Sequence, residues 1–176
     1  MNPWQTVAQR VVYENEWFRV REDRVIRPDG ADGIYGTVEM AAAVGVVALD
    51  ESWQVQLVGQ WRYPLGRFSW EVPSGSCEGT EEPLEAGRRE LEEEAGLRAR
   101  TWRQLGTLDT CNAVTTEVVH LFLATGLEVV GSRPDPMEEL VAKKVPLREC
   151  VAMVMDGRIT DATSVAAILK AARVVV

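Results

Sequence analysis

The stretch GSCEGTEEPLEAGRRELEEEAGL, residues 75–97, carries the strongest fold signal in the chain. Its residues follow the spacing G-x5-E-x7-R-E-U-x-E-E-x-G-U, where U is a bulky apolar residue. The fixed positions are occupied by Gly75, Glu81, Arg89, Glu90, Leu91, Glu93, Glu94, Gly96 and Leu97. A pattern this long and gapless rarely arises by chance. It predicts a short helix with a carboxylate face.

Local signals predict where this helix begins and ends. The run GTEEP, residues 79–83, has a candidate N-cap at Thr80 and a proline in the first turn, both typical of a helix start. Gly96 is typical of the residue that follows the last turn. Leu84 and Leu91 lie two helical turns apart and are expected to face the core.

Three acids of this helix lie on one face. Glu90 and Glu94 are four residues apart, and Glu93 is three residues after Glu90. Carboxylates so close repel one another unless a hard cation sits among them, and Mg2+ and Mn2+ prefer oxygen ligands. Arg89, eight residues after Glu81, is expected to pair with it and tie the preceding loop to the helix.

A solvated acidic helix is the alternative interpretation. Residues 78–94 hold eight Glu and two Arg, so clustering of acids alone indicates little. The spacing, in contrast, favours a metal site. Glycine inside a helix is about 1 kcal/mol less favourable than alanine. Its presence at position 87 therefore indicates close packing of the backbone there.

Length and composition indicate one globular domain. The chain has 176 residues, 46% hydrophobic and 26% charged, enough to bury a sizeable core. A net charge of −8 argues against a nucleic-acid partner. An anionic substrate would be repelled from the acidic helix unless cations bridged the two, so a phosphate substrate implies a cation-dependent enzyme.

The cysteines and the N-terminus favour a cytoplasmic protein. Cys77, Cys111 and Cys150 are odd in number and widely spaced, which is typical of reduced thiols rather than disulfides or a zinc site. The N-terminal residues MNPWQTVAQR lack the apolar core of a signal peptide. We expect no membrane association, because no apolar run approaches the length of a membrane span.

Alternation and turn signals predict the remaining elements. An N-terminal hairpin is expected over residues 10–27, followed by a turn at 28–30. Further strands are expected over 35–49, 53–60, 68–72, 99–107, 117–126 and 139–145, and helices over 146–155 and 161–172. Strands before and after a central helix, with helices at the end, indicate an α/β (α+β) fold with a layered sandwich.

The spacing of residues 75–97 resembles the signature of the Nudix hydrolases, a family that cleaves nucleoside diphosphates linked to another moiety. The run GQWRYPLGRFSWEVPSG, residues 59–75, resembles the branch of ADP-ribose and nucleoside diphosphate sugar pyrophosphatases. Residues 12–30 and 143–169 are similar to the same branch. The resemblance therefore covers most of the chain.

This resemblance implies a fold and a domain organisation. The expected fold is a Nudix-type α/β/α sandwich with a mixed sheet, preceded by an N-terminal β-hairpin. Residues 1–36 would form the hairpin extension and residues 37–176 the Nudix domain. Members of this branch are often homodimers in which the N-terminal hairpin reaches across to the partner, so a homodimer is expected here.

The resemblance also implies a metal site for Mg2+ or Mn2+. In the family the cation bridges the diphosphate while an activated water attacks phosphorus. Glu90 and Glu94 would be the principal ligands, Glu93 a third ligand or the general base, and Ser74 a ligand through its carbonyl oxygen. The positions that shape the motif are Gly75, Glu81, Arg89 and Gly96.

Other carboxylates compete with Glu93 for the role of catalytic base. In this branch a Glu in a loop after the motif is often proposed as the base. Glu138 and Glu139, in PDPMEEL, match that description. The alternative for each is an ordinary surface carboxylate.

Three residues before the motif are candidates for substrate binding. Arg62 has the planar donor fork that matches phosphate or ribose oxygens, and a salt bridge is its alternative role. Glu71 would orient the site or bind a ribose hydroxyl. Trp61 would stack on a nucleobase, with ordinary packing as the alternative.

The resemblance implies metal-dependent hydrolysis of the pyrophosphate bond of ADP-ribose or a related nucleoside diphosphate sugar, giving a nucleoside monophosphate and a sugar phosphate. One departure leaves other sugar nucleotides open. ADP-ribose pyrophosphatases commonly carry a proline downstream of the motif, and here no proline occurs between Pro83 and Pro134. Two alternatives are a non-catalytic Nudix domain that senses a nucleotide metabolite and a housecleaning pyrophosphohydrolase of nucleoside triphosphates.

Overall fold

The computed structural model describes residues 2–131 and 139–175. The elements in chain order are β1 (Gln5–Glu14), β2 (Phe18–Ile26), β3 (Asp32–Met40), β4 (Ala43–Ala48), β5 (Gln54–Arg62), the 3-10 helix η1 (Tyr63–Leu65), β6 (Arg67–Glu71), β7 (Ser74–Ser76), α1 (Pro83–Ala95), β8 (Leu97–Asp109), β9 (Val118–Val129), β10 (Val141–Pro146), α2 (Leu147–Met155) and α3 (Ala162–Val175). Within the described ranges, no helix is both long and apolar enough to cross a lipid bilayer.

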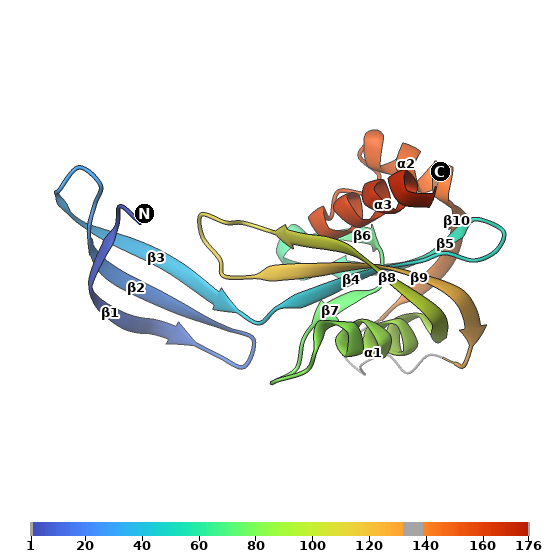
Figure 1. Ribbon diagram of the computed structural model, residues 1–176, viewed down its shortest axis with the longest axis horizontal. Coiled ribbons are helices and arrows are strands. Elements are labelled where there is room, and N and C mark those ends of the chain that lie inside the picture. Colours follow the sequence, from blue (N-terminus) through green and yellow to red (C-terminus); the bar gives the residue numbers. More distant parts are fainter. Residues whose placement is uncertain (1, 132–138, 176) are drawn as a thin grey trace. The chain divides into compact units, whose positions relative to one another are not determined.

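One compact unit combines Met1–Ala41 with Asp109–Val118. Its strands form an antiparallel sheet in the order β1-β2-β3, blue in Figure 1. The expected N-terminal hairpin is present as β1 and β2, and β3 extends it by a third strand. A single strand over 35–49 is wrong, because the chain leaves this sheet after Met40 and joins another at Ala43.

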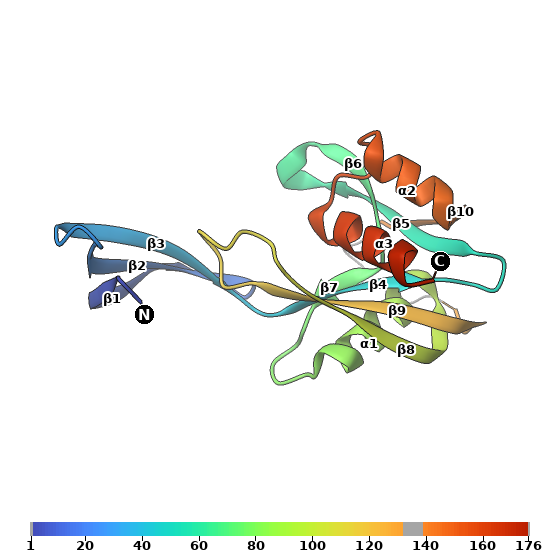
Figure 2. The ribbon, with the colours of Figure 1, turned by 45° about the horizontal axis from the view of Figure 1, so that its top comes forward.

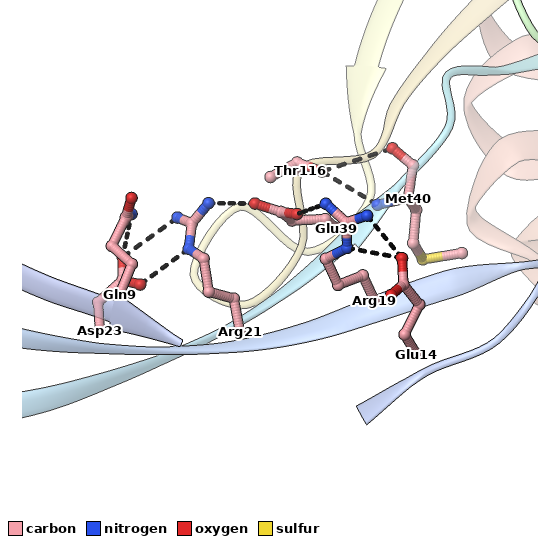
Figure 3. A network of polar contacts seen from close by, with 8 residues as sticks. All are labelled: Gln9, Glu14, Arg19, Arg21, Asp23, Glu39, Met40 and Thr116. Carbon is pink, nitrogen blue, oxygen red and sulfur yellow. Dashed lines mark hydrogen bonds and ion pairs between the residues drawn. The ribbon is translucent and has the colours of Figure 1, made fainter. Parts of the chain in front are cut away.

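One face of this sheet carries a row of linked polar side chains (Figure 3). Arg21 Nε donates to Asp23 Oδ1 over 2.8 Å, and its guanidinium also pairs with Glu39. Arg19 Nη1 lies 3.7 Å from Oε2 of the same Glu39. The complete row is Gln9, Asp23, Arg21, Glu39, Arg19 and Glu14. Alternating charges across neighbouring strands stabilise this polar face.

The segment Asp109–Val118 covers the edge of β3. The Val38 N–H donates to the Val114 carbonyl over 2.8 Å, and the Thr116 N–H donates to the Val38 carbonyl over 3.0 Å. The Met40 N–H donates to Thr116 Oγ1 over 3.1 Å (Figure 3). These bonds protect backbone groups that an open edge strand would leave available for aggregation.

The second compact unit combines Ala42–Leu108 with Val119–Val176 and is an α/β/α sandwich (Figure 1). Its central sheet has the order β7-β4-β9-β8 and is mixed, because β4 runs parallel to β9 and antiparallel to β7. Val44 and Val46 of β4 pack on the side of α1, whereas Val47 packs with α2 and α3. The expected layered fold with a mixed sheet is confirmed.

A smaller antiparallel sheet, β10-β5-β6, lies beside α2 and α3 (Figure 2). Val55, Leu57 and Val145 from this sheet are buried in the same apolar cluster as both helices. By alternation along the strand, the opposite face of β5 carries Gln56, Val58, Gln60 and Arg62. The sheet thus contributes an apolar face to the core, and Arg62 at the end of β5 pairs with Glu71, which precedes the motif by four residues.

The start of α1 differs from the expectation. Glu82, with no side-chain capping bond, precedes the first helical residue Pro83, so the predicted cap at Thr80 is wrong. Proline suits this position because its φ angle is already helical and its missing N–H leaves no donor unpaired. Gly96 ends the helix as predicted, in the left-handed conformation with φ 63°.

Candidate active site

Helix α1 buries two carboxylates of its acidic face. Glu90 is 9% exposed and Glu94 is 5% exposed, and Leu91 between them is fully buried against β4. Acids are rarely this buried unless they are paired or bind a ligand. Glu93 is more accessible, with 42% of its side chain exposed. The three predicted acids therefore share one side of the helix at different depths.

The carboxylate of Glu90 explains the glycine that opens the motif. A Cβ added to Gly75 would lie 2.0 Å from Oε1 and 2.3 Å from Cδ of Glu90. Gly75 belongs to β7 and pairs with Val44 of β4, so its backbone is held in the sheet. A larger residue at this point would require the Glu90 carboxylate to move.

Arg89 links the acids to the preceding loop. It donates to both carboxylate oxygens of Glu81, over 3.2 and 3.0 Å, and to the Ser76 carbonyl over 2.9 Å. Its Nη1 also donates to Glu90 over 2.7 Å and to Glu93 over 3.1 Å. The hydrogen bonds to Glu81, followed by the nearby acids, raise the pKa of Arg89 above its usual value. The expected pairing of Arg89 with Glu81 is present.

Ser74 lies directly beside the deeper acid. Its backbone N–H donates to Glu94 Oε2 over 2.9 Å. The contact brings the end of the run Glu71–Ser74 against the last turn of α1. The proposed use of the Ser74 carbonyl as a metal ligand stays a prediction.

Arg62 and Glu71 form a two-pronged ion pair. Arg62 Nε donates to Glu71 Oε1 over 2.9 Å and Nη2 donates to Oε2, with Glu71 buried and 38% of the Arg62 side chain exposed. The hydrogen bonds to Glu71 raise the pKa of Arg62, and the charges of Asp161 and Glu94 raise it further. The salt bridge is thus present, and a substrate contact of Arg62 stays a prediction.

The remaining predicted residues have different surroundings. Trp61 is 62% exposed and lies opposite Phe68 in the pairing of β5 with β6. Glu139 is exposed and precedes β10. Glu138 lies outside the described residues. Their proposed roles in stacking and base catalysis stay predictions.

The donor set suits a hard divalent cation in its chemistry. Glu90, Glu93, Glu94 and the Ser74 carbonyl offer oxygen ligands of the kind Mg2+ and Mn2+ prefer. In the part of the chain that the structure describes, no three acidic, His or Cys side chains converge closely enough to hold an ion as they stand. Arg89 lies between Glu90 and Glu93, so ion binding requires these carboxylates to turn toward one another.

Two further residues adjoin this region, and sequence reasoning does not assign them to it. The N–H and Oγ of Ser164 both donate to Asp161 Oδ2 over 2.7 Å, and the Val72 N–H donates to Ser164 Oγ over 2.9 Å. In sequence, Asp161 followed by Ser164 indicates only a helix start. The contact with Val72 depends on tertiary packing, which no local signal reports.

Comparison with known proteins identifies the family. Residues 39–163 match the NUDIX domain, and residues 4–38 match the nucleoside diphosphate sugar hydrolase N-terminal domain. The chain belongs to the Nudix family. It is a Nudix hydrolase, as the spacing of residues 75–97 predicts.

Several relatives of this Nudix hydrolase match most of its length. It is 34% identical over 170 residues to an ADP-ribose pyrophosphatase of Mycobacterium tuberculosis, covering 94% of this chain and 82% of the relative. It is 30% identical over 166 residues to an ADP-ribose pyrophosphatase of Bacillus subtilis, covering 93% and 90%. A CMP-5'-(N-acetyl-N-hydroxy-3-aminopropyl)phosphonate hydrolase of Streptomyces rubellomurinus is 28% identical over 163 residues, covering 92% and 79%.

A solved structure confirms the Nudix fold. The crystal structure of an ADP compounds hydrolase superposes with a TM-score of 0.87, covering 98% of this chain and 94% of that chain. The sequence identity is 19%, so this likeness concerns the fold.

Proposed function

We propose that this Nudix hydrolase cleaves the pyrophosphate bond of ADP-ribose or a related nucleoside diphosphate sugar, with Mg2+ or Mn2+ as cofactor. The products are a nucleoside monophosphate and a sugar phosphate. The observation that carries the proposal is the pair of buried acids, Glu90 and Glu94, with Glu90 packed on Gly75. The match of residues 4–38 and the two ADP-ribose pyrophosphatase relatives support the substrate class.

The acids of α1 have distinct proposed roles. Glu90 and Glu94 would hold the cation with the Ser74 carbonyl, because their oxygens lie deepest beside β7. A bound cation neutralises the diphosphate, lowers the pKa of a bound water and stabilises the leaving phosphate. Glu93, the most exposed of the three, is proposed as a third ligand or as the base that takes the proton of the water. Glu138 and Glu139 are the alternative bases.

Arg62 is proposed to bind a phosphate or ribose oxygen. A guanidinium has five N–H donors, and Glu71 accepts from two nitrogens, so donors remain for a substrate. Glu71 would hold the guanidinium in place for that contact. Trp61, whose ring is largely exposed, is proposed to stack on the nucleobase.

The decisive experiment compares Glu94→Gln with the wild type and with Glu85→Gln. We assay ADP-ribose and a panel of nucleoside diphosphate sugars with Mg2+ and with Mn2+. The Glu94 variant should lose about a hundredfold or more in kcat/KM, which corresponds to about 3 kcal/mol. Glu85 is exposed on the same helix and pairs with Arg88, so its variant changes the same charge outside the site and should keep wild-type rates. Full activity of Glu94→Gln would contradict the proposal.

Product analysis by mass separates the alternatives. The proposed enzyme releases a nucleoside monophosphate and a sugar phosphate. A pyrophosphohydrolase of nucleoside triphosphates releases inorganic pyrophosphate instead. A sensor binds the sugar nucleotide with either metal and leaves it intact.

We also propose a homodimer formed through the N-terminal sheet. The pairing register places an apolar set on the face opposite the polar row of Figure 3. This set comprises Tyr13, Phe18, Val20, Val38 and Met40. Tyr13 is half exposed, and its ring lies 5.7 Å from that of Phe18. The same face also carries the ion pair of Arg10 with Glu22, so the apolar set is a patch at the Phe18–Val20 end of this face. Such a patch on a three-stranded sheet gains stability when another surface covers it.

Light scattering with size-exclusion chromatography tests the dimer. Tyr13→Lys places a charge in the apolar patch and should shift the wild-type dimer toward the monomer. Gln9→Lys places the same charge on the polar face, next to Asp23, and should leave the dimer intact. A monomeric wild type, or equal behaviour of the two variants, would exclude this interface.

A cytoplasmic location is proposed from the cysteine chemistry. Cys77, Cys111 and Cys150 are free thiols, and Cys111 is exposed. Reducing compartments preserve such thiols. The net charge of −8 supports a small anionic substrate bound through cations, without a nucleic-acid partner.

A further inference from the structure

The run Val72–Ser74, which joins β6 to β7, is tied to three different elements. The Val72 N–H donates to Ser164 Oγ at the start of α3, over 2.9 Å. The Pro73 carbonyl accepts from the Val46 N–H of β4, over 2.9 Å. The Ser74 N–H donates to Glu94 of α1. Of these three bonds, the one to α3 uses a side chain, Ser164, that lies outside the motif.

The start of α3 is itself held firmly. Ser164 is completely buried, and its N–H and Oγ both donate to Asp161 Oδ2 over 2.7 Å. The neighbouring Thr163 packs on Gly45, where an added Cβ would lie 2.4 Å from Thr163 Cγ2. Gly45 of β4 is the strand partner of Ser74 of β7. The start of α3 therefore packs against the strand pair that contributes Ser74 to the candidate site. A side chain fixed in this way can define the position of the backbone it bonds.

We propose that Ser164 is a positioning residue for the hydrolytic site. Its Oγ, oriented by Asp161, holds the Val72 N–H and thereby sets the backbone of Glu71–Ser74. That backbone positions the Glu71 carboxylate, which accepts hydrogen bonds from Arg62. It also brings the Ser74 N–H to Glu94. The inference rests on the proposed function, which gives this run its ligands for the cation and the substrate.

The physical reason is the burial of the Val72 N–H. Val72 is fully buried, so a lost acceptor leaves its donor unsatisfied and favours a backbone shift that reaches other partners. A misplacement of about 1 Å, even one caused by a change far from the reacting atoms, can lower the rate by about a hundredfold. Residues that orient the groups bound to a metal typically change affinity or activity by about 10- to 100-fold when removed.

The test compares Ser164→Ala with Ser164→Thr and with Ala167→Gly. Thr keeps the hydroxyl acceptor, whereas Ala167→Gly weakens α3 one turn further along without removing a bond to Val72. We measure kcat and KM on ADP-ribose, the Mn2+ dissociation constant by electron paramagnetic resonance, and exchange of the Val72 amide by NMR. In Ser164→Ala the Val72 amide hydrogen should exchange faster than in the wild type. The same variant should bind Mn2+ about tenfold more weakly and lose about tenfold in kcat. Ser164→Thr should recover most of each loss, and Ala167→Gly should keep wild-type kcat and Mn2+ affinity.

The outcomes separate this inference from the proposed function. A wild type that binds Mn2+ and cleaves no sugar nucleotide refutes the proposed function, while amide exchange and Mn2+ affinity still decide the role of Ser164. Ser164→Ala with wild-type Mn2+ affinity and kcat, or with losses matched by Ala167→Gly, overturns the positioning role. Should Ser164→Ala fail to fold, Ser164→Cys keeps a similar volume with a weak acceptor and should show the same loss of Mn2+ affinity.

Discussion

At the scale of single residues, Gly75 is under a steric constraint set by the Glu90 carboxylate. Its replacement by Ala would push a Cβ to within 2.0 Å of Glu90 Oε1. We expect Gly75→Ala to displace that carboxylate and reduce metal-dependent turnover by about a hundredfold, since small misplacements of reacting groups have effects of this size. Steady-state kinetics over a range of Mg2+ concentrations measure the loss. Gly36→Ala, which meets nothing within 4 Å, is the control and should behave as the wild type.

Glu81 provides a prediction of pH dependence. The hydrogen bonds from Arg89, helped by the Glu78 N–H, hold the pKa of Glu81 below its ordinary value of 4.5. A carboxyl with a lowered folded pKa contributes stability above its unfolded pKa, and this contribution disappears as the pH falls through the folded pKa. Glu81→Gln should therefore be less stable than the wild type at neutral pH, with a difference that shrinks below pH 4.5. Urea unfolding at several pH values checks this, and a difference independent of pH would refute it.

At the scale of elements, α1 shows how far local signals reach. The acids, the apolar spacing and Gly96 predict its C-terminal end and its buried face, because these features depend on helical geometry alone. The same signals mislead at Thr80, since several residues in the run GTEEP can precede a first turn. Pro83 decides the start, because its ring fixes the φ angle of the first helical residue.

The same helix offers a test of packing at Gly87. A Cβ there would lie 3.4 Å from Trp102 Cζ3 and from Val46 Cγ2, which is ordinary contact. Gly87→Ala should therefore raise the free energy of unfolding by about 0.5–1 kcal/mol through helix propensity. Gly87→Val should overfill the same space and destabilise the protein by about 1–3 kcal/mol. Urea unfolding of both variants measures these effects, and a destabilised Ala variant would show that the site has no room.

At the scale of the whole molecule, the two units differ in their apolar cores. Nearly all buried apolar residues belong to the unit with the motif, whereas Val25 is the one from the N-terminal sheet among the described residues. All ten residues of β1 are exposed. We therefore expect amides of β1 to exchange much faster than those of β4 and β9 in a dilute solution.

The proposed dimer makes this exchange depend on concentration. Hydrogen exchange with mass spectrometry should show β1 becoming more protected as the protein concentration rises, because association buries the apolar patch of the sheet. Strands β4 and β9 serve as internal controls and should stay protected throughout. Rates in β1 that do not respond to concentration over the range in which light scattering detects a dimer would place the interface elsewhere.

The sequence by itself determined the sandwich, its central helix and the acids on that helix, together with the family. These features follow from periodicity and spacing within short segments, where neighbours in sequence are neighbours in space. The tertiary structure decided the break between β3 and β4, the packing of Glu90 on Gly75, the ion pair of Arg62 with Glu71 and the bond from Val72 to Ser164. Each of these is a contact between distant segments, and only the packing of sheets and helices brings those segments together.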